Sequence, residues 1–326
     1  MNNSKTNSIL SSASNYIKKN FSSVGSIVLA LIGICVVWSR LTPYFFTFAN
    51  FKNISVYIAA NGIMAAGLTV VLLMGGIDLS QMALMALSGM CVAIGYENGA
   101  SGLTLILIAI LAGLLGGLFN AFLITKLRIM PFIATLGSQL VFRALAFIST
   151  SGRYVTIKDP LIKFVGFGSV LGLPTLLLIM LVVYIIVWFV LKYTQYGRNV
   201  YSVGSSAPAS FLSGVNIQKE RIISYVICGA CSGLASILYI AQGSVALNNA
   251  GTGNELDIIA GVILGGLSMS GGKGSVVNTL LGILLMAVIA NGMSLLSVSS
   301  YYQMLLRGVI LLAAIFLDTI RGKGSD

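Results

Sequence analysis

Residues 54–96 read ISVYIAANGIMAAGLTVVLLMGGIDLSQMALMALSGMCVAIGY, and this stretch decides the kind of fold. It holds two apolar runs, 54–75 and 82–96, and its one charged residue is Asp78. A helix needs about 20 predominantly apolar residues to cross the hydrocarbon core of a bilayer. The stretch therefore predicts two membrane helices, the second of them short, joined by a break at Gly75, Gly76 and Asp78.

The composition of the whole chain excludes a water-soluble domain. Of its 326 residues, 57% are apolar and 8% are charged, with a mean hydropathy of +0.98, whereas soluble proteins carry about 25% charged residues. The net charge is +11, but Lys and Arg occur singly between apolar runs and form no basic stripe that would bind nucleic acid. The expected partner of these charges is the membrane lipid surface.

The chain contains no histidine, which excludes imidazole metal sites and His-based nucleophile or proton-relay systems. Its four cysteines lie in apolar stretches, and the pair Cys228 and Cys231 has no second pair or basic neighbour. We therefore expect buried apolar thiols and no metal site. An integral-membrane enzyme acting on lipid is one alternative class, but the sequence offers it no His, acidic cluster or metal-ligand spacing.

Ten stretches are predicted to be membrane helices. They are 24–38, 54–75, 82–96, 103–123, 131–150, 173–191, 222–242, 256–267, 276–296 and 302–320. The third and eighth are short for a bilayer. The predicted fold class is an all-α integral membrane protein with about ten transmembrane helices, in a single transmembrane domain over 24–320 between tails at 1–23 and 321–326.

The distribution of Lys and Arg among the loops predicts the orientation, because cytoplasmic loops carry an excess of basic residues. If the N-terminus is cytoplasmic, the inner side collects Lys5, Lys18, Lys19, Lys126, Arg128, Lys192, Arg198, Lys219, Arg221, Lys273, Arg321 and Lys323. The outer side holds Arg40, Lys52, Arg153, Lys158 and Lys163. This asymmetry predicts that both termini are cytoplasmic and that the polar first segment is a tail rather than a removed signal peptide.

The longest loop on the predicted inner side spans 194–220. Within it, residues 207–213 are predicted to form one or two helical turns, with Ser206 as N-cap, Pro208 in the first turn and Gly214 as the stop signal. A short helix held at the cytoplasmic surface is either a docking surface for a partner or a simple connector.

The break in the opening stretch has two interpretations. Asp78 and Gln81 have the spacing of a capping box for the helix that follows, and the break also suits a gate hinge or a contact on a transport pathway. A similar string recurs later: LGGLSMS at 264–270 matches MGGIDLS at 74–80, which hints at an internal repeat.

Two other glycine patterns have structural interpretations. The segment GGKGS at 271–275 does not fit a phosphate-binding loop, because Leu267 and Gly274 stand where Gly and Ser or Thr are required. Gly113 and Gly117 form a GxxxG pattern in an apolar run of small residues, and we expect it to pack helices within one chain rather than between two.

Polar residues inside the apolar stretches mark candidate positions of a gate or a solute pathway. They are Asn61, Asp78, Ser80, Asn120, Gln139, Arg143, Gln242, Asn291 and Arg307, with Glu255 and Asp257 at the start of the eighth stretch. Most are amides or lone charges rather than the chain of carboxylates that ion coupling requires, so they favour a neutral polyhydroxylated solute. For each residue the alternative is a hydrogen bond between helices.

Three strings resemble, in order along nearly the whole chain, the inner-membrane permeases of ribose, galactose, arabinose and allose ABC importers. They are GGIDLSQMALMALSGM at 75–90, YGRNVYSVGSS followed by FLSGVNIQK at 196–219, and GTGNELDIIAGVILGGLSMSGGKGSV at 251–276. The resemblance implies a multi-pass protein of the bacterial inner membrane that works as a homodimer. It also implies two other partners: a cytoplasmic ATPase with two fused nucleotide-binding halves, and a secreted or periplasmic sugar-binding protein.

By the same resemblance, the inner loop couples the permease to the ATPase. The implied coupling residues are Gly204, Ser206, Ala209, Ser210, Phe211, Leu212, Ser213 and Gly214. The chain itself is then no enzyme and needs no cofactor, because the ATPase uses the ATP and magnesium. The expected cargo is a monosaccharide such as ribose or allose. The alternatives are another small solute, such as a furanose signalling molecule, carried by the same importer type, or an ion-coupled secondary transporter.

The predicted orientation can be tested by labelling single cysteines in a chain whose native cysteines have been replaced. A membrane-impermeant maleimide added from outside should modify the Lys158→Cys variant and leave Ser210→Cys unmodified, because the excess of basic residues places position 210 in the cytoplasm. The reverse labelling pattern would invert the topology.

Overall fold

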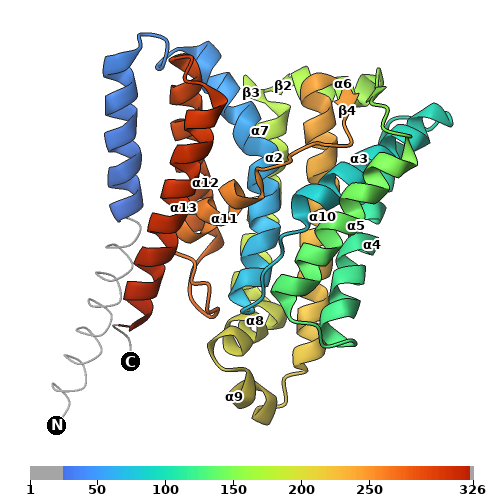
Figure 1. Cartoon of the computed structure of the whole chain (residues 1–326), viewed down its shortest axis with the longest axis vertical. Helices are drawn as coiled ribbons and strands as arrows, with labels where there is room; N and C mark the ends of the chain where they lie inside the picture. Colours follow the sequence, from blue (N-terminus) through green and yellow to red (C-terminus); the bar gives the residue numbers. More distant parts are fainter. Residues whose placement is uncertain (1–24, 324–326) are drawn as a thin grey trace.

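The computed structural model describes residues 25–323, and helices make up most of it (Figure 1). The helices are Gly25–Leu41, α2 (Phe48–Leu73), α3 (Gln81–Glu97), α4 (Leu103–Thr125), α5 (Pro131–Ser149), α6 (Pro160–Phe167), α7 (Thr175–Tyr193), α8 (Gln195–Ser205), α9 (Ala207–Leu212), α10 (Ile217–Gly243), α11 (Glu255–Leu264), α12 (Val276–Leu295) and α13 (Ser300–Lys323). Two antiparallel strand pairs complete the described part: β1 (Val155–Thr156) with β4 (Val245–Ala246), and β2 (Ser169–Val170) with β3 (Leu173–Pro174).

Six of the described helices are long and apolar enough to cross a membrane, namely α2, α4, α5, α7, α10 and α12. A helix also lies in each of the other predicted stretches. However, Gly25–Leu41 and the apolar part of α13, Ser300–Phe316, are shorter, and α3 and α11 have 17 and 10 residues. The prediction of a helical membrane protein is confirmed, while ten transmembrane helices stay a prediction.

The ends of the predicted transmembrane domain fall partly outside the described residues. This applies to the tail 1–23 and to Val24, the predicted first residue of the first helix. At the other end, α13 continues to Lys323, past the boundary predicted at 321, and residues 324–326 lie outside the described part.

The connections between helices gather at two opposite ends of the bundle (Figure 1). One end carries α6 and the strands, together with the loops that follow α3 and α5. The other end carries α8 and α9, together with the loops that follow α4 and α11. This arrangement agrees with the prediction that the loops rich in Lys and Arg lie on one side of the membrane and the other loops on the opposite side. Which end faces the cytoplasm stays a prediction.

Helix α2 lies at the centre of the bundle. Its most apolar window is 83% buried inside the protein, against 28% for the windows of α5 and α7. The peripheral helices expose large apolar side chains on their outer faces, for example Leu111 of α4 and Ile185 of α7. Such faces suit contact with lipid tails. In the interior around α2, the backbone N–H and C=O groups form their hydrogen bonds within the protein.

Helices α4 and α10 pack with their backbones in direct contact. A Cβ atom on Gly113 would overlap the carbonyl oxygen of Gly229, and a Cβ atom on Gly229 would overlap that of Gly113. Gly117 and Gly233 meet the backbone of the opposite helix in the same way. The GxxxG pattern of α4 therefore packs within the chain, as the sequence predicts, and it faces a second GxxxG pattern in α10.

Replacing Gly229 by Ala should force α4 and α10 apart, because the added methyl group has no space beside the Gly113 carbonyl. Overpacking of this kind costs about 1–3 kcal/mol, so the melting temperature of the detergent-purified protein should fall. The control is Gly308→Ala in α13, where an added Cβ meets no atom within 4 Å. Equal melting temperatures for the two variants would contradict the tight seam.

The structure changes one detail of the labelling test. Ser210 is only 2% exposed, whereas Lys158 and Ser213 are exposed. A cysteine at position 210 would therefore stay unlabelled from either side of the membrane. Ser213→Cys is the informative reporter for the predicted inner face.

Candidate functional site

Hydrogen bonds around Asp78 stabilise the link between α2 and α3. Asp78 is 2% exposed, and its Oδ1 accepts from the backbone N–H of Ser80 (2.8 Å) and from the Ser80 hydroxyl (2.6 Å). From α4, the Nδ2 of Asn120 donates to Ser80 Oγ at 2.8 Å and to Asp78 Oδ2 at 3.5 Å. The structure therefore brings Asp78 and Ser80, both predicted from the sequence, together with Asn120.

The predicted capping box is wrong. Helix α3 begins at Gln81 with Ser80 at the N-cap position, so Asp78 lies two residues before the cap. The Gln81 side chain donates to the carbonyl oxygen of Asp78 (3.3 Å) instead of accepting its N–H. The physical reason is that Asp78 accepts the backbone N–H of Ser80, which lies before the first residue of α3. Asn120 of α4 then donates to Ser80 and holds Asp78 and Ser80 in place.

Neighbouring helices also satisfy the backbone of this link. The carbonyl oxygen of Ile77 accepts a hydrogen bond from the Tyr225 hydroxyl of α10 (3.1 Å), and Thr135 Oγ1 of α5 lies 3.5 Å from it. Lipid tails offer no hydrogen bonds, so non-helical backbone at membrane depth needs such internal partners. The break between α2 and α3 is thus a packed junction of α3, α4, α5 and α10.

A second group of predicted residues joins α5 to the start of α11. Gln139 Nε2 donates to Glu255 Oε1 (3.2 Å), and Arg143 Nη2 lies 3.6 Å from the same oxygen. Arg143 Nη1 also donates to the carbonyl oxygens of Ala250 (2.8 Å) and Asn248 (3.2 Å). These contacts hold the segment that leads into α11 against α5.

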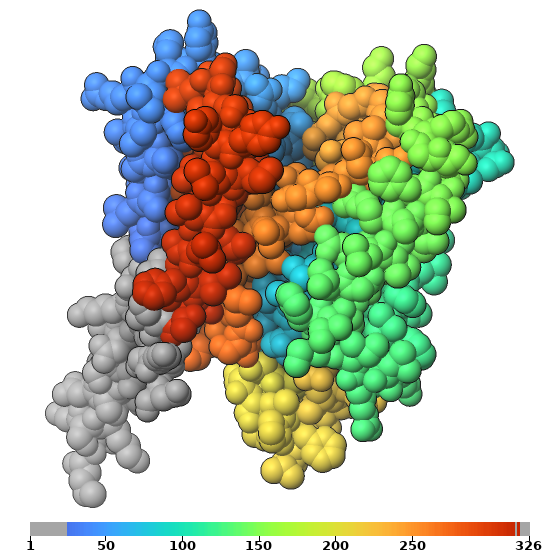
Figure 2. Space-filling view, viewed as in Figure 1, coloured from blue at the N-terminus to red at the C-terminus, as the bar shows by residue number. Residues whose placement is uncertain are grey.

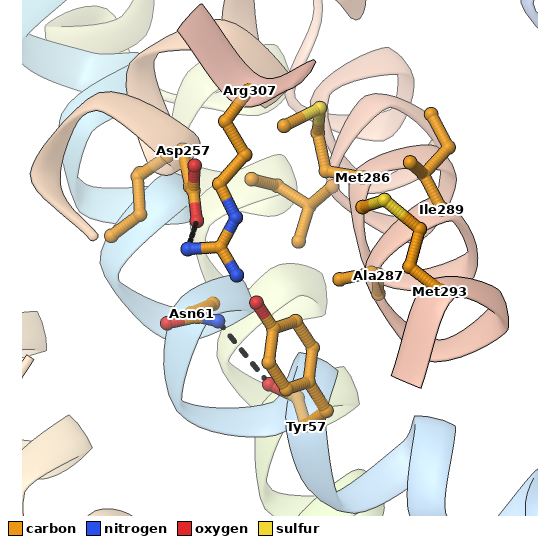
Figure 3. A pocket seen from close by; sticks show the side chains of 11 residues that line it. Tyr57, Asn61, Asp257, Met286, Ala287, Ile289, Met293 and Arg307 are labelled. Carbon is orange, nitrogen blue, oxygen red and sulfur yellow. Dashed lines mark hydrogen bonds and ion pairs between the residues drawn. The ribbon is translucent and has the colours of Figure 1, made fainter. Parts of the chain in front are cut away.

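A third group lines a pocket between α2, α11, α12 and α13. Arg307 Nη1 lies 2.8 Å from Asp257 Oδ2 and donates to Asn254 Oδ1 (3.2 Å). Figure 3 shows the Arg307 guanidinium and the Tyr57 hydroxyl pointing toward one another, with Asn61 beside them. Apolar residues of α12 form the opposite wall, and the cavity volume is about 20 Å³, which is room for about one water molecule.

Arg143 and Arg307 are therefore not the lone charges that the sequence suggested. Each forms an ion pair with a carboxylate in the first turn of α11, Arg143 with Glu255 and Arg307 with Asp257. Residues two apart on a helix point about 200° apart, so the two carboxylates face different neighbours. Helix α11 is held between α5 and α13 by these two pairs.

Two predicted residues lie elsewhere and make bonds between helices. Asn291 of α12 exchanges two amide hydrogen bonds with Asn50 of α2 (2.9 and 2.8 Å). Gln242 of α10 donates to the carbonyl oxygen of Val56 (3.1 Å). Tyr57 and Asn254, in contrast, line or border the pocket and were missed, because a Tyr inside an apolar helix and an Asn in a loop carry no distinctive sequence signal.

The two similar strings end α2 and α11 with the same kind of turn, but the left-handed glycine of the turn falls at a different position in each string. After α2, the amides of Gly75 and Gly76 bond the carbonyls of Leu72 and Val71, and Gly75 has φ +73°. After α11, the residue in this left-handed position is Gly266, with φ +83°. Both turns are Schellman motifs. The second is displaced by one residue from the sequence match, which pairs Gly266 with Gly76.

Helix α8 is tied to α10 at the end of the bundle that carries α9. The hydroxyls of Tyr196 and Ser224 lie 2.8 Å apart, and Asn199 Nδ2 donates to Glu220 Oε1 (2.7 Å). Burial raises the pKa of the Tyr196 phenol above its usual range, so this side chain is a neutral hydrogen-bonding group. These contacts fix α8 and thereby the position of α9.

The short helix α9 forms where the sequence predicts it. Ser206 Oγ accepts the N–H of Ala209, Pro208 lies in the first turn, and Gly214 follows with φ +82°. Of the predicted coupling residues, Ser210 faces inward and bonds Ser202, whereas Phe211 and Leu212 are 70% and 86% exposed. In Figure 2, the yellow α8–α9 region projects beyond the helical bundle.

Helices long and apolar enough to cross a membrane, ion pairs between helices and an exposed short helix at one end fit a membrane transport protein. Comparison with known proteins gives the family. The family described as "Branched-chain amino acid transport system / permease component" matches residues 50–315. The chain belongs to this family, among the permeases of sugar ABC importers, and is a multi-pass protein of the bacterial inner membrane.

Curated relatives are similar over most of their length. The chain is 41% identical to the ribose import permease protein RbsC of Escherichia coli (strain K12), over 89% of this chain and 92% of that protein. It is 37% identical to RbsC of Bacillus subtilis (strain 168), over 89% and 91%. It is 33% identical to the D-allose transport system permease protein AlsC of Escherichia coli (strain K12), over 91% of each. No solved structure matches the chain.

Replacing Arg307 by Ala should destabilise the protein, because the buried Asp257 carboxyl group would lose its ion-pair partner. Breaking a buried ion pair costs about 3–5 kcal/mol, and the effect should be smaller here because 26% of the Arg307 side chain is exposed. The melting temperature in detergent measures it, and a double change to Ala at both positions should recover part of the loss.

The matched control is the exposed ion pair of Arg153 with Glu97, whose side chains are 66% and 41% exposed. Arg153→Ala should change stability by less than about 1 kcal/mol. If Arg307→Ala melts at the same temperature as Arg153→Ala, the Arg307–Asp257 pair does not hold α13 to α11.

Proposed function

We propose that this chain is the membrane-spanning subunit of an ATP-driven importer that takes up a monosaccharide, ribose- or allose-like, delivered by a secreted binding protein. The relatives named for ribose and D-allose support the cargo class. The observation that carries the proposal is α9, which exposes Phe211 and Leu212 beyond the bundle on a firmly anchored α8. Exposed adjacent apolar residues on a rigid support are typical of a protein-docking surface.

In this proposal, α9 docks in a groove of a cytoplasmic ATPase with two fused nucleotide-binding halves. That partner would bind the ATP and magnesium, and the chain itself would have no cofactor and catalyse no reaction. Gly204, Ser206, Ala209, Ser213 and Gly214 shape the coupling element around the exposed pair, with Ser210 fixing its inner side. Both termini would then share the cytoplasmic face with α9.

The solute pathway would pass the polar groups of α11 and its neighbours. The pocket of Tyr57, Asn61, Asp257 and Arg307 combines an aromatic ring, an amide and a charged pair, which are groups that hydrogen-bond sugar hydroxyls. The charges are already paired, so hydroxyl groups would find only weak additional bonds. Weak binding suits a transport path, since a tight site would retain the sugar.

A second copy of the chain would complete the pathway. Figure 2 shows α5 in green and α13 in red on either side of a strip formed by other segments. Both helices expose apolar side chains, such as Leu140 and Ile148 of α5 and Leu305 and Leu312 of α13. We propose that two copies meet along this face. The binding protein would dock at the opposite end from α9, over α6 and the strand pairs.

The cargo test measures uptake of radiolabelled ribose and D-allose in cells that express the chain with its ATPase and binding protein. Uptake of either sugar that depends on the ATPase supports the proposal. Retention of another solute by the binding protein would select the alternative cargo, including the amino acids in the family's description. Transport that persists without the ATPase and stops with an uncoupler would identify a secondary transporter.

Phe211→Glu should reduce sugar uptake by about tenfold or more, because burying an unpaired charge in an ATPase groove is unfavourable by several kcal/mol. Membrane levels of the permease should not change, because Phe211 is 70% exposed and does not support the fold. The control is Gln218→Glu, an equal charge on the exposed first turn of α10. Unchanged co-purification of Phe211→Glu with the ATPase would contradict the docking site.

A further inference from the structure

The C-terminal part of α8 lies in close backbone contact with two other segments. A Cβ atom on Gly204 would overlap the carbonyl oxygen of Leu73, the last residue of α2, and would lie 2.5 Å from the nitrogen of Gly272. A Cβ atom on Gly272 would lie 2.5 Å from the hydroxyl oxygen and 2.6 Å from the nitrogen of Ser205. We call the contact of Gly204, Gly272 and the Leu73 carbonyl the glycine junction. No side chain fits between its three parts.

Hydrogen bonds close the glycine junction. The N–H of Gly272 donates to the Leu73 carbonyl (2.9 Å), and the Tyr201 hydroxyl of α8 donates to the carbonyl of Gly274 (3.1 Å). The last carbonyls of a helix have no partner within the helix. The loop between α11 and α12 thus supplies the partner that the end of α2 lacks, and α8 is bonded to the same loop.

The glycine junction lies next to two segments that carry candidate pathway residues. A Cβ atom on Gly271 would lie 2.8 Å from the nitrogen of Gly75, which begins the link to Asp78. On the other side, the loop belongs to α11, whose first turn carries the two paired carboxylates, and the N–H of Met269 donates to Asp318 of α13 (3.1 Å). The ends of α2, α8, α11 and α13 therefore meet at one place.

Contacts between backbones transmit displacement differently from contacts between side chains. A long side chain can change rotamer and absorb a shift, whereas packed backbones have no such freedom and move together. A displacement of α8 must therefore carry the end of α2 and the α11–α12 loop with it, or break the bond between Gly272 and Leu73.

We propose that the glycine junction is the relay through which movement of α9 reaches the Asp78 link and α11. Gly204 and Gly272 are positioning residues: they touch neither the ATPase nor the sugar, and they act by keeping α8 in backbone contact with α2 and the loop. This inference rests on the proposed function. It predicts that a methyl group in the junction separates ATP hydrolysis from transport.

The test uses the complete importer, with permease, ATPase and binding protein in proteoliposomes, and measures sugar uptake and ATP hydrolysis together. In Gly272→Ala, uptake per ATP should fall by about tenfold, equivalent to a coupling loss of about 1.4 kcal/mol. Co-purification with the ATPase should persist, because Phe211 and Leu212 are unchanged. A purely structural defect would lower co-purification and uptake alike.

Each glycine has a matched control with the same backbone conformation and open space. Gly272 has φ +69°, and its control is Gly99→Ala, with φ +87° and no atom within 4 Å of an added Cβ. Gly204 lies inside a helix, and its control is Gly33→Ala, inside the helix Gly25–Leu41 and likewise open. Both controls should keep the wild-type ratio of uptake to hydrolysis.

Tyr201→Phe is a milder variant that removes the hydroxyl bonded to Gly274 and adds no volume. It should lower uptake per ATP to a value between the wild type and Gly272→Ala, and it decides the question if the glycine variants do not reach the membrane. The control is Tyr193→Phe, an exposed tyrosine at the end of α7.

Wild-type uptake per ATP in both Gly272→Ala and Tyr201→Phe would overturn the relay while leaving the proposed function intact. If only Tyr201→Phe folds, its result alone has the same meaning. A wild-type importer that shows no ATPase-dependent uptake would instead overturn the proposed function itself.

Discussion

The pairing of the two carboxylates of α11 with arginines of two other helices is the interaction on which the arrangement of this bundle depends. An unpaired charge inside a membrane protein costs several kcal/mol, so Glu255 and Asp257 can lie in the interior only where cations reach them. Arg143 and Arg307 reach them from α5 and α13, and the ten-residue helix α11 is held between these two longer helices. A helix too short to span the membrane is thus fixed by charge rather than by length.

This pairing also bears on transport. Each of the two carboxylates of α11 is engaged by an arginine of the same chain. The groups that remain around the pairs are the Tyr57 hydroxyl and the amides of Asn61 and Gln139, all neutral and able to bond hydroxyl groups.

Local features of the structure could be predicted from the sequence, because their signals lie within a few residues. The short helix α9, with Ser206, Pro208 and Gly214 at its ends, is one example, and the GxxxG packing of Gly113 and Gly117 is another. The ion pairs could not be predicted, since Arg143 and Glu255 are joined only by the tertiary fold.

The capping-box prediction for Asp78 and Gln81 failed for a related reason, while the gate or pathway role of Asp78 stays a prediction. The spacing of Asp78 from Gln81 suits a capping box, but bonds from Asn120, 42 residues later, let α3 begin further on.

The similar strings at 74–80 and 264–270 have a physical explanation that requires no repeat. Each has to end a helix inside the protein, and a glycine in the left-handed conformation does this at Gly75 and at Gly266. The displacement by one residue between these two turns argues against a copied unit with conserved geometry. What the two strings share is a location: the segment after Gly266 returns through Gly271 and Gly272 to the end of α2. Backbones approach this closely only where side chains are absent, and Gly271 and Gly272, which follow the second string, bring its segment against Gly75 and against Gly204 of α8.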